Sequence, residues 1–554
     1  MKKFPGLVLG LLLVFLSPYV SAALVALAAT DPADEAMTQI RLEAIRADMR
    51  FLADDLLEGR GTGARGHEIA ARFTAAQFEA DGLEPAGDAG TYFQYVPLRS
   101  FRPGQQQTTL ALTHAGKEER LIFGEDFLTR GDAARKETSV EAGVVYVGYG
   151  VTAPNQDYDD YKGVDAKGKI VAMLFGAPQK FPTTLRAHHS SQREKAANAV
   201  AHGAVGLIIL DSPLLEQIYG FKHQLHDLAF PNLRWLGPEG KPNDYFEELN
   251  ASVFLSMGGV KKLCDGSGKA PDDLYRAAQE GRPMSFALPA TVKIHVATQL
   301  EALRSPNVVA QLRGSDPALR KEYVVYTAHS DHLGIGEPVE GDNIYNGAAD
   351  NASGTAALLE IARAYSQMKP RPRRSILFVS VTGEEAGLLG SDYFAHFPTV
   401  PKNTMVADIN MDGAALFWPL EDMVLAGQEH STLADQVQQA AARMNLAVGQ
   451  EIFPEQVFFI RSDQYSFVRQ GIPAVMSNSG LKSSDPNIQP KEILLKWLGT
   501  VYHTPKDDMN QRFDFEAATK YSRFNFLLGY LIAQKSERPT WRPGDFFGEK
   551  YAKK

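Results

Sequence analysis

The sequence SILFVSV, residues 375–381, runs directly into TGEEAGLLGS, residues 382–391. The first segment is an unbroken apolar run, which is typical of a strand buried on both faces of a sheet. Two adjacent acids, Glu384 and Glu385, follow it. Burying a carboxylate costs free energy unless the group is paired or binds a cation. A core strand that ends in two acids therefore predicts that its carboxyl end faces a cationic site.

Strand and helix patterns alternate on either side of this stretch, from about residue 307 onward. The clearest segments are PNVVAQLRG (306–314), EYVVYTAH (322–329), GTAALLEIARAYSQM (354–368), MVADINMDG (405–413) and IPAVMSNSG (472–480). Strands separated by helices of this length favour a largely parallel sheet that is covered on both faces. We therefore expect an α/β fold with a mostly parallel mixed sheet flanked by helices.

The chain opens with MKKFPGLVLGLLLVFLSPYVSA, in which two lysines precede an apolar run and small residues. This pattern predicts a signal peptide over residues 1–28, cleaved near Ala22 or Ala28, and hence export to the periplasm or secretion. The apolar run, residues 6–16, is shorter than the roughly 20 residues that span a bilayer, so we expect no membrane span after cleavage. With one cysteine, Cys264, no intramolecular disulfide is possible, and the formal charge of −9 gives no reason to expect nucleic-acid binding.

Composition and periodicity divide the remaining chain into four parts. Helical periodicity in residues 37–98 predicts the N-terminal part of the main domain. Short β-type runs divided by glycines predict an inserted β-rich region over residues 99–298, with its core at about 140–290. The main domain continues over residues 299–540, and residues 541–554 are predicted to be a C-terminal tail.

Histidines and acids stand at several of the predicted strand ends. They are His329, Asp331 and His332 after YVVYTA, Glu384 and Glu385 after SILFVSV, Asp412 after VADINM, Asp350 before a helix, and His503 in YHTPKDD. Ligands of open α/β sheets bind outside the carboxyl ends of the strands. Imidazole and carboxylate both suit zinc, and a set of this size exceeds the needs of one ion but fits two, about 3.5–4 Å apart. Asp350 is the candidate bridge, and one of the two glutamates could bind metal while the other accepts a proton from water.

Five segments in this order resemble the co-catalytic zinc aminopeptidases of the M28 type. They are AHSDHLG (328–334), NGAADNASGTAALLE (346–360), TGEEAGLLGS (382–391), INMDG (409–413) and YHTPKDD (502–508). The resemblance covers about residues 307–532 and the N-terminal helices, and it implies two zinc ions per chain. It implies that His329 and Asp412 bind one zinc, Glu385 and His503 bind the other, and Asp350 bridges them.

The same resemblance implies three further roles. Glu384 would be the general base, Asp331 would orient His329, and Tyr502 would donate a hydrogen bond to the developing oxyanion. The family often has a cis peptide after the bridging aspartate, which here would be Asp350-Asn351. Two positions depart from the family pattern: Ser330 replaces a commoner aromatic residue, and Gln464 in RSDQYSF replaces a usual histidine.

The inserted region resembles a protease-associated domain in VVYVGYG (144–150), DYKGVDAKGKIVAMLFG (160–176) and AANAVAHGAVGLIIL (196–210). Such a module is expected to roof the cleft and limit access to it.

Three functions stay open at this point. The first is an exported aminopeptidase that acts on peptides with free N-termini. The second is a carboxypeptidase on the same scaffold, for which Arg461 is the candidate that would bind the terminal carboxylate. The third is a non-enzymatic binding protein, which is disfavoured because every ligand position and the base are occupied. Residues 417–419 and 453–466 are candidate pocket loops, and Phe458, Phe459 and Phe467 suggest an apolar pocket; the sequence does not indicate the oligomeric state.

Overall fold

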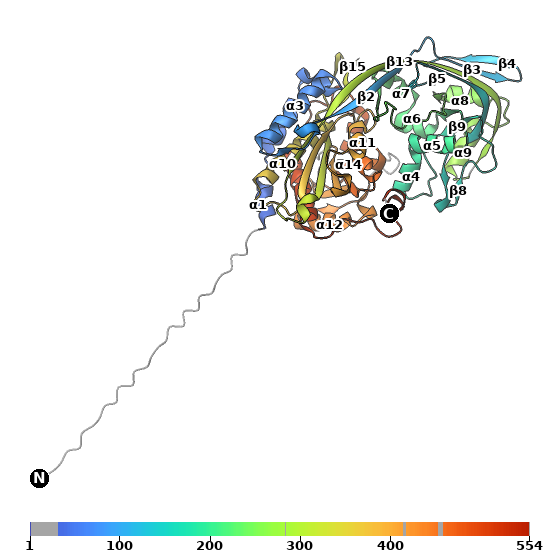
Figure 1. Cartoon of the computed structure of the whole chain (residues 1–554). Helices are drawn as coiled ribbons and strands as arrows, with labels where there is room; N and C mark the ends of the chain where they lie inside the picture. Colours follow the sequence, from blue (N-terminus) through green and yellow to red (C-terminus); the bar gives the residue numbers. More distant parts are fainter. Residues whose placement is uncertain (2–30, 283, 414–416, 452–457, 553–554) are drawn as a thin grey trace.

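The computed structural model describes residues 1, 31–282, 284–413, 417–451 and 458–552. Apart from Met1, the segment predicted to be a signal peptide lies outside the described residues. The described chain forms two lobes, which strands β2 (Phe93–Pro103) and β13 (Ser285–Leu312) join across the top of Figure 1. A search of the described helices finds none that is both long and apolar enough to cross a membrane.

The first lobe is built on a mixed, mostly parallel sheet, so the predicted α/β fold is confirmed. Its parallel strands are β17 (Ser375–Val381), β14 (Tyr323–His329), β18 (Met405–Met411) and β21 (Ala474–Ser479). Antiparallel strands flank them, with β13 beside β17 and β19 (Asp422–Ala426) beside β21. Two short strands, β1 (Glu84–Pro85) and β20 (Ala447–Val448), extend the sheet. Every residue of β17 is buried, as its apolar run predicts.

Alternating residues of the central strand β14 explain why helices cover both faces of the sheet. Val324, Tyr326 and Ala328 belong to the larger core, whereas Val325 belongs to the core on the other face. The larger core is closed by α1 (Pro32–Thr38), α2 (Leu42–Leu52), α3 (Arg65–Ala80), α10 (Ser353–Gln367), α12 (Leu433–Arg443) and α15 (Phe515–Gln534). The opposite core is closed by α11 (Leu389–His396) and α13 (Gln464–Val468). Helix α14 (Pro490–Thr500) precedes the loop that carries His503.

The second lobe, formed by the inserted region, has a sheet and an apolar core of its own. Its strands are β3 (Thr109–His114), β4 (Lys117–Leu121), β5 (Phe127–Leu128), β6 (Glu137–Val147), β9 (Ile170–Leu174), β10 (Gly206–Leu210) and β12 (Ser252–Leu255), with the small pair β7 (Thr152–Ala153) and β8 (Tyr158–Asp159). Its helices are α4 (Thr183–Ser190), α5 (Gln192–Ala201), α6 (Pro213–Tyr219), α7 (Phe221–His226), α8 (Met257–Cys264) and α9 (Pro271–Gln279).

Strand β13 belongs to both lobes. Residues 285–297 pair with β6, residues 298–308 pair with β2, and residues 308–312 pair with β17. The boundary predicted between residues 298 and 299 therefore lies inside one continuous strand. Strand β11 (Asn232–Trp235) adds to the outer edge of β2. The hairpin of β15 (Gly334–Val339) and β16 (Asp342–Tyr345) lies close to the 3-10 helix η1 (Asp55–Arg60).

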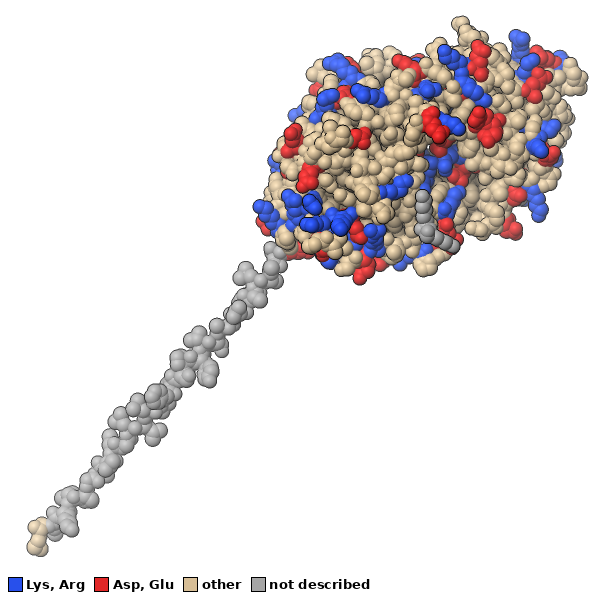
Figure 2. All heavy atoms as spheres, viewed as in Figure 1, with Lys and Arg blue, Asp and Glu red and all other residues tan. Residues whose placement is uncertain are grey.

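The segment predicted to be a tail, residues 541–554, contains the short helix α16 (Phe546–Tyr551). The helix lies next to α4 of the second lobe, since its Lys550 ammonium is 3.0 Å from Nε2 of His188. The Trp541 indole N–H donates to the carbonyl of Gly471 at 3.0 Å, and Phe547 is buried. Figure 2 shows acidic and basic side chains interspersed over the face in view.

One arginine holds together three segments that lead into the carboxyl edge of the first sheet. Arg60 is fully buried and donates to the carbonyls of Ser330 (2.9 Å), Asn346 (2.6 Å) and Gly347 (2.8 Å), and also to that of Leu52. Its own carbonyl accepts a hydrogen bond from the His332 N–H at 3.1 Å. Because the side chain satisfies several buried acceptors at once, its loss should be costly.

We predict that Arg60→Met lowers the free energy of unfolding by about 3 kcal/mol or more, because each buried carbonyl left without a donor costs about 1–3 kcal/mol. Chemical denaturation followed by fluorescence would measure the change. Arg50→Met, at an exposed position of α2, is the matched control and should change stability by less than about 0.5 kcal/mol. Equal effects of the two substitutions would contradict the role assigned to Arg60.

Candidate metal centre

His329 is the last residue of β14 and lies at the carboxyl edge of the sheet. Its imidazole is buried, and Nε2 lies 3.2 Å from Oδ1 of Asp350 and 3.2 Å from Oδ1 of Asp412. Asp412 follows β18, the parallel neighbour of β14, so the ladder brings both residues to the same edge.

A second histidine lies on the other side of Asp350. His503 Nε2 is 3.2 Å from Oδ2 of Asp350 and 3.1 Å from Oε2 of Glu385. Neither contact has hydrogen-bond geometry, since this buried nitrogen has no hydrogen-bond partner among the described residues. Asp350 thus directs one carboxylate oxygen to each histidine, which is the arrangement that a bridging ligand requires.

The backbone around Asp350 is held from two directions. The Asp507 carboxylate accepts hydrogen bonds from the Ala349 and Asp350 N–H groups at 2.9 and 3.0 Å. The Asn351 side chain donates to the Met411 carbonyl at 3.0 Å, next to Asp412. The Asp350-Asn351 bond is cis, as predicted. Asp507 stands in the quoted segment YHTPKDD, but its role as an acceptor for backbone amides leaves no signal in sequence spacing.

Glu384 and Glu385 diverge after β17. Glu385 faces His503 and also His332, whose Nδ1 lies 2.6 Å from Oε1. Glu384 lines the adjoining pocket, and its backbone N–H donates to Oδ1 of Asp331 at 3.2 Å. Burial, together with the negative charges of Asp412 and Glu385, holds the pKa of the Glu384 carboxyl well above its usual range and outweighs the opposite effect of His329.

Asp331 lies behind this group, where the family resemblance implies that it orients His329. The His329 Nδ1 atom lies 3.2 Å from the backbone carbonyl of Asp331 and 3.8 Å from its carboxylate. The other carboxylate oxygen accepts a hydrogen bond from the Thr62 hydroxyl at 2.8 Å. Asp331 therefore contacts the backbone of Glu384 more closely with its side chain than it contacts His329. Thr62 comes from the N-terminal segment, and nothing in the sequence pattern singled it out.

His332 lies in the segment AHSDHLG, but the family resemblance gives it no role. It is buried, and its Nε2 has no hydrogen-bond partner among the described residues. Together with Asp350 and Glu385 it forms one of three groups of potential ligand atoms that lie within 4.8 Å of one another. The other two groups are His329 with Asp350 and Asp412, and His329 with Glu384 and Glu385. The signal that could have found His332 is its place in the same strand exit as His329.

The titration of these groups fits a site for cations. Burial alone would lower the pKa of His503, but Glu385 and Asp350 raise it to about 10. Burial likewise opposes ionisation of Glu385, yet His503 and His332 lower its pKa to about 2. The pKa of His329 is also raised well above its usual range, because Asp412 and Glu384 outweigh burial. Protons on the histidines thus balance the negative charge of the carboxylates, and bound metal ions could supply the same positive charge. Nitrogen and oxygen donors of this kind suit zinc.

A cavity of about 180 Å³ opens beside this cluster. Its lining includes the polar residues Asp350, Glu384, Asp412 and Tyr502, and the apolar residues Phe417, Trp418, Val424, Phe458, Met476, Trp497 and Leu498. Arg461 also lines it, and its guanidinium lies over the Phe458 ring at 5.6 Å. Tyr502 stacks on His503 with ring centroids 3.8 Å apart. Phe459 and Phe467, which the sequence suggested for the pocket, lie in the apolar core, and residues 453–457 of the predicted loop lie outside the described residues.

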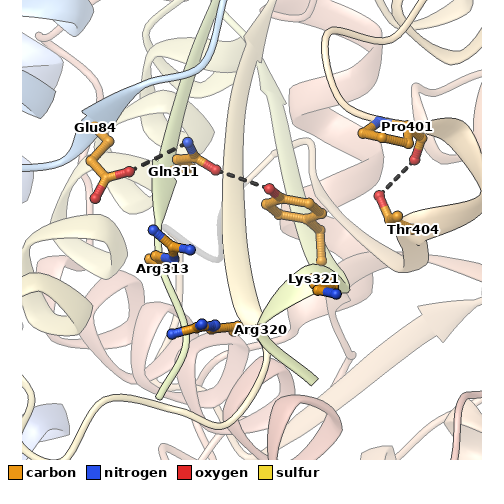
Figure 3. Close-up of a pocket in the computed structure, with 8 residues that line it drawn as sticks. Glu84, Gln311, Arg313, Arg320, Lys321, Pro401 and Thr404 are labelled. Atoms are coloured by element: carbon orange, nitrogen blue, oxygen red, sulfur yellow. Dashed lines mark hydrogen bonds between the residues drawn. The ribbon is translucent and has the colours of Figure 1, made fainter. Parts of the chain in front are cut away.

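A larger pocket of about 390 Å³ lies elsewhere (Figure 3). It is lined by Glu84, Gln311, Arg313, Arg320, Lys321, Tyr323, Pro401 and Thr404, and contains none of the candidate ligands. Tyr323 begins β14 and His329 ends it, so the two sites are roughly 20 Å apart at the usual rise of a strand. The candidate ligands at the strand ends therefore lie beside the cavity of about 180 Å³ and not beside this pocket.

Comparison with known proteins agrees with this geometry. The model of Peptidase family M28 matches residues 307–526. The chain is 29% identical over 302 residues to Aminopeptidase NAALADL1 of Rattus norvegicus, covering 46% of this chain and 37% of that protein. It is 26% identical over 321 residues to a Glutamate carboxypeptidase 2 homolog of Caenorhabditis briggsae, covering 50% and 37%. It is 25% identical over 351 residues to Transferrin receptor protein 2 of Homo sapiens, covering 58% and 40%.

The matched parts span less than half the length of these curated relatives. Among solved structures, an aminopeptidase from Aneurinibacillus sp. strain AM-1 superposes with a TM-score of 0.52 at 20% identity, covering 91% of this chain and 97% of that one. This likeness shows that the fold is shared.

We predict that zinc binding at pH 7 releases at least two protons per chain, because a histidine must be neutral to bind metal and both His329 and His503 have raised pKa values. Glu384, whose pKa is also raised, can release a further proton when cations bind beside it. Calorimetry of zinc binding in buffers of different ionisation enthalpy would count the protons. His503→Gln should lower the count by about one, whereas His295→Gln, in the second lobe, should leave it unchanged. Zinc uptake without proton release would contradict the charge balance described above.

Proposed function

We propose that this chain, whose residues 307–526 match the model of Peptidase family M28, is an exported metallo-aminopeptidase that uses two zinc ions. The observation that carries the proposal is the position of Asp350, which directs one oxygen to His329 and the other to His503 at 3.2 Å each. Single-ion sites have no need of a carboxylate shared in this way.

In this proposal His329 and Asp412 hold one zinc, Glu385 and His503 hold the other, and Asp350 is common to both. Two zinc ions held here would polarise the scissile carbonyl and make an attacking water molecule more acidic. His332 contacts Glu385 at 2.6 Å and would orient that carboxylate. Tyr502 lines the same cavity as Glu384, where its hydroxyl could donate to the oxygen that becomes negative.

Glu384 is proposed to be the general base. It lines the cavity beside Asp412, and the contact between its backbone N–H and Asp331 fixes the start of the turn that carries it. A base must be within reach of the water that attacks and of the amine that leaves, and a carboxylate at the cavity wall can serve both. Bound cations would lower the raised pKa of Glu384 toward the range in which it accepts a proton.

The shape and charge of the cavity favour the aminopeptidase alternative. Its lining is mostly apolar, so it can take a large apolar side chain of an N-terminal residue. Recognition of a terminal carboxylate usually needs more than one cation, and among the described lining residues Arg461 is the only one. The relatives' names include an aminopeptidase, a carboxypeptidase homologue and a receptor, so similarity alone does not choose between the three functions.

Tripeptides with free and with acetylated N-termini distinguish the three alternatives. With zinc-loaded protein, mass spectrometry should show loss of the first residue from free peptides only, fastest for large apolar residues. Loss of the last residue from acetylated peptides would instead favour a carboxypeptidase. No cleavage of either set would favour the binding protein.

We predict that Glu384→Gln lowers kcat by about 10²–10⁴-fold, because glutamine keeps the shape of the side chain but cannot accept the proton. Zinc content, measured by atomic emission, should remain about two ions per chain. Glu337→Gln, at an exposed glutamate of β15, is the matched control and should keep full activity. Retained turnover in Glu384→Gln would remove Glu384 from the mechanism.

A further inference from the structure

A buried histidine of the second lobe contacts both the first lobe and the C-terminal helix. His188, on α4, is fully buried, with Nδ1 2.7 Å from the Tyr465 hydroxyl of α13 and Nε2 3.0 Å from the Lys550 ammonium of α16. An ammonium group can only donate, so Nε2 is the acceptor in the contact with Lys550, and the Glu194 carboxylate lies 3.3 Å from the same nitrogen. Lys550 also pairs with Glu194 of α5 at 2.8 Å. Three segments far apart in the sequence thus meet at one imidazole.

Helix α16 is anchored on the first lobe at the same point. The Asp545 carboxylate at its start lies 2.6 Å from Nδ1 of His430. The buried Phe547 ring packs against Phe459 and Tyr465, with centroids 5.0 and 6.4 Å apart. The helix therefore contacts α4 of the second lobe through Lys550 and α13 of the first lobe through Phe547.

Tyr465 belongs to a short folded segment that ends at the metal centre. Its backbone N–H donates to the Ser462 carbonyl at 3.1 Å. The Gln464 side chain donates to the Phe459 carbonyl at 2.8 Å and accepts from Asn410 at 3.3 Å. The amide of Gln464, at the position that departs from the family pattern, thus ties this segment to the end of β18.

Ser462 makes the last contact in the series. Its hydroxyl donates to Oδ2 of Asp412 at 2.6 Å and accepts from the Asn410 amide at 2.7 Å. Ser462 and Arg461 also line the cavity beside the candidate ligands. A carboxylate ligand is oriented by such hydrogen bonds, and losing one typically costs tenfold or more in metal affinity or activity.

We propose that His188, Lys550 and Tyr465 form a latch between the lobes, and that the closed latch positions Ser462 against the metal ligand Asp412. The contact between the two lobes at His188 is thereby linked to the geometry of one metal site. Tyr465 is a positioning residue, which acts through Ser462. The inference rests on the proposed function for the zinc site at Asp412, whereas its effects on zinc affinity and on hydrogen exchange are measured without a substrate.

A double-mutant cycle on zinc affinity tests the latch in the full chain. Tyr465→Phe removes only the hydroxyl and Ser462→Ala removes only the contact with Asp412. Each should weaken the binding of one zinc by about tenfold, measured by competition with a chelator. Because both changes break the same series of contacts, the double variant should bind zinc no more weakly than Ser462→Ala alone. Tyr161→Phe, which removes a buried hydroxyl elsewhere in the second lobe, should leave zinc affinity unchanged.

Hydrogen exchange supplies the second readout. In Tyr465→Phe and in Lys550→Met, exchange in residues 458–468 and 183–190 should speed up together, with the melting temperature lowered by only a few degrees. Unchanged zinc affinity in Tyr465→Phe, or fully additive effects in the double variant, would overturn the latch. If the wild-type protein cleaves no peptide, the proposed function is wrong. The zinc affinities and the hydrogen-exchange rates of the variants still test the latch in that case.

Discussion

The rest of the structure depends on one electrostatic constraint, which is the cost of gathering four carboxylates at the buried end of a sheet. Asp350, Glu384, Glu385 and Asp412 crowd around His329 and His503. Without counter-charge this cluster would repel itself in a medium where charges interact strongly. The raised pKa values of both histidines are the response of the protein to that cost. A pair of divalent cations would balance these carboxylates more completely, and this is the charge argument for the proposed metal centre.

The fold keeps the cluster in place with groups that carry no chemistry themselves. Parallel pairing of β14 with β17 and β18 sets the strand ends side by side, so the ligands need only follow them. Arg60 then ties the loops after β14 and β16 to the N-terminal helices through buried carbonyls. Asp507 does the same for the backbone at Asp350. The contacts of Arg60 and Asp507 therefore position the loops of the site without a bound metal or substrate, while Nε2 of His332 and Nε2 of His503 have no hydrogen-bond partner among the described residues.

The sequence predicts those features of the structure that appear as local patterns of residues. Buried strands such as β17 appear as apolar runs, and the acids and histidines that follow them are visible because polar residues rarely end such runs. Single contacts between side chains or backbone groups distant in the sequence have no period and no motif, so Thr62 and Arg60 gave no signal. Ser462 enters only as part of the candidate pocket loop 453–466, and the sequence does not predict its contact with Asp412. The predicted boundary between residues 298 and 299 lies within one residue of the place where the partner of β13 changes, since Ala297 pairs with β6 and Thr298 pairs with β2. The sequence pattern did not reveal that one continuous strand crosses this boundary.

The way the second lobe is attached has a mechanical consequence. Strands β2 and β13 leave the first sheet as a paired ribbon, and β13 enters the second sheet without a break. A continuous hydrogen-bonded ribbon resists sliding of its strands but can bend. The two lobes are therefore held together at the end where β2 and β13 join them. Away from this ribbon, the separation of the lobes is set by side-chain contacts. Among them, His188 lies 2.7 Å from Tyr465 and 3.0 Å from Lys550. Because Tyr465 shares a hydrogen-bonded turn with Ser462, a change in that separation acts first on the Asp412 side of the metal centre, and the side of Glu385 and His503 is affected only through Asp350.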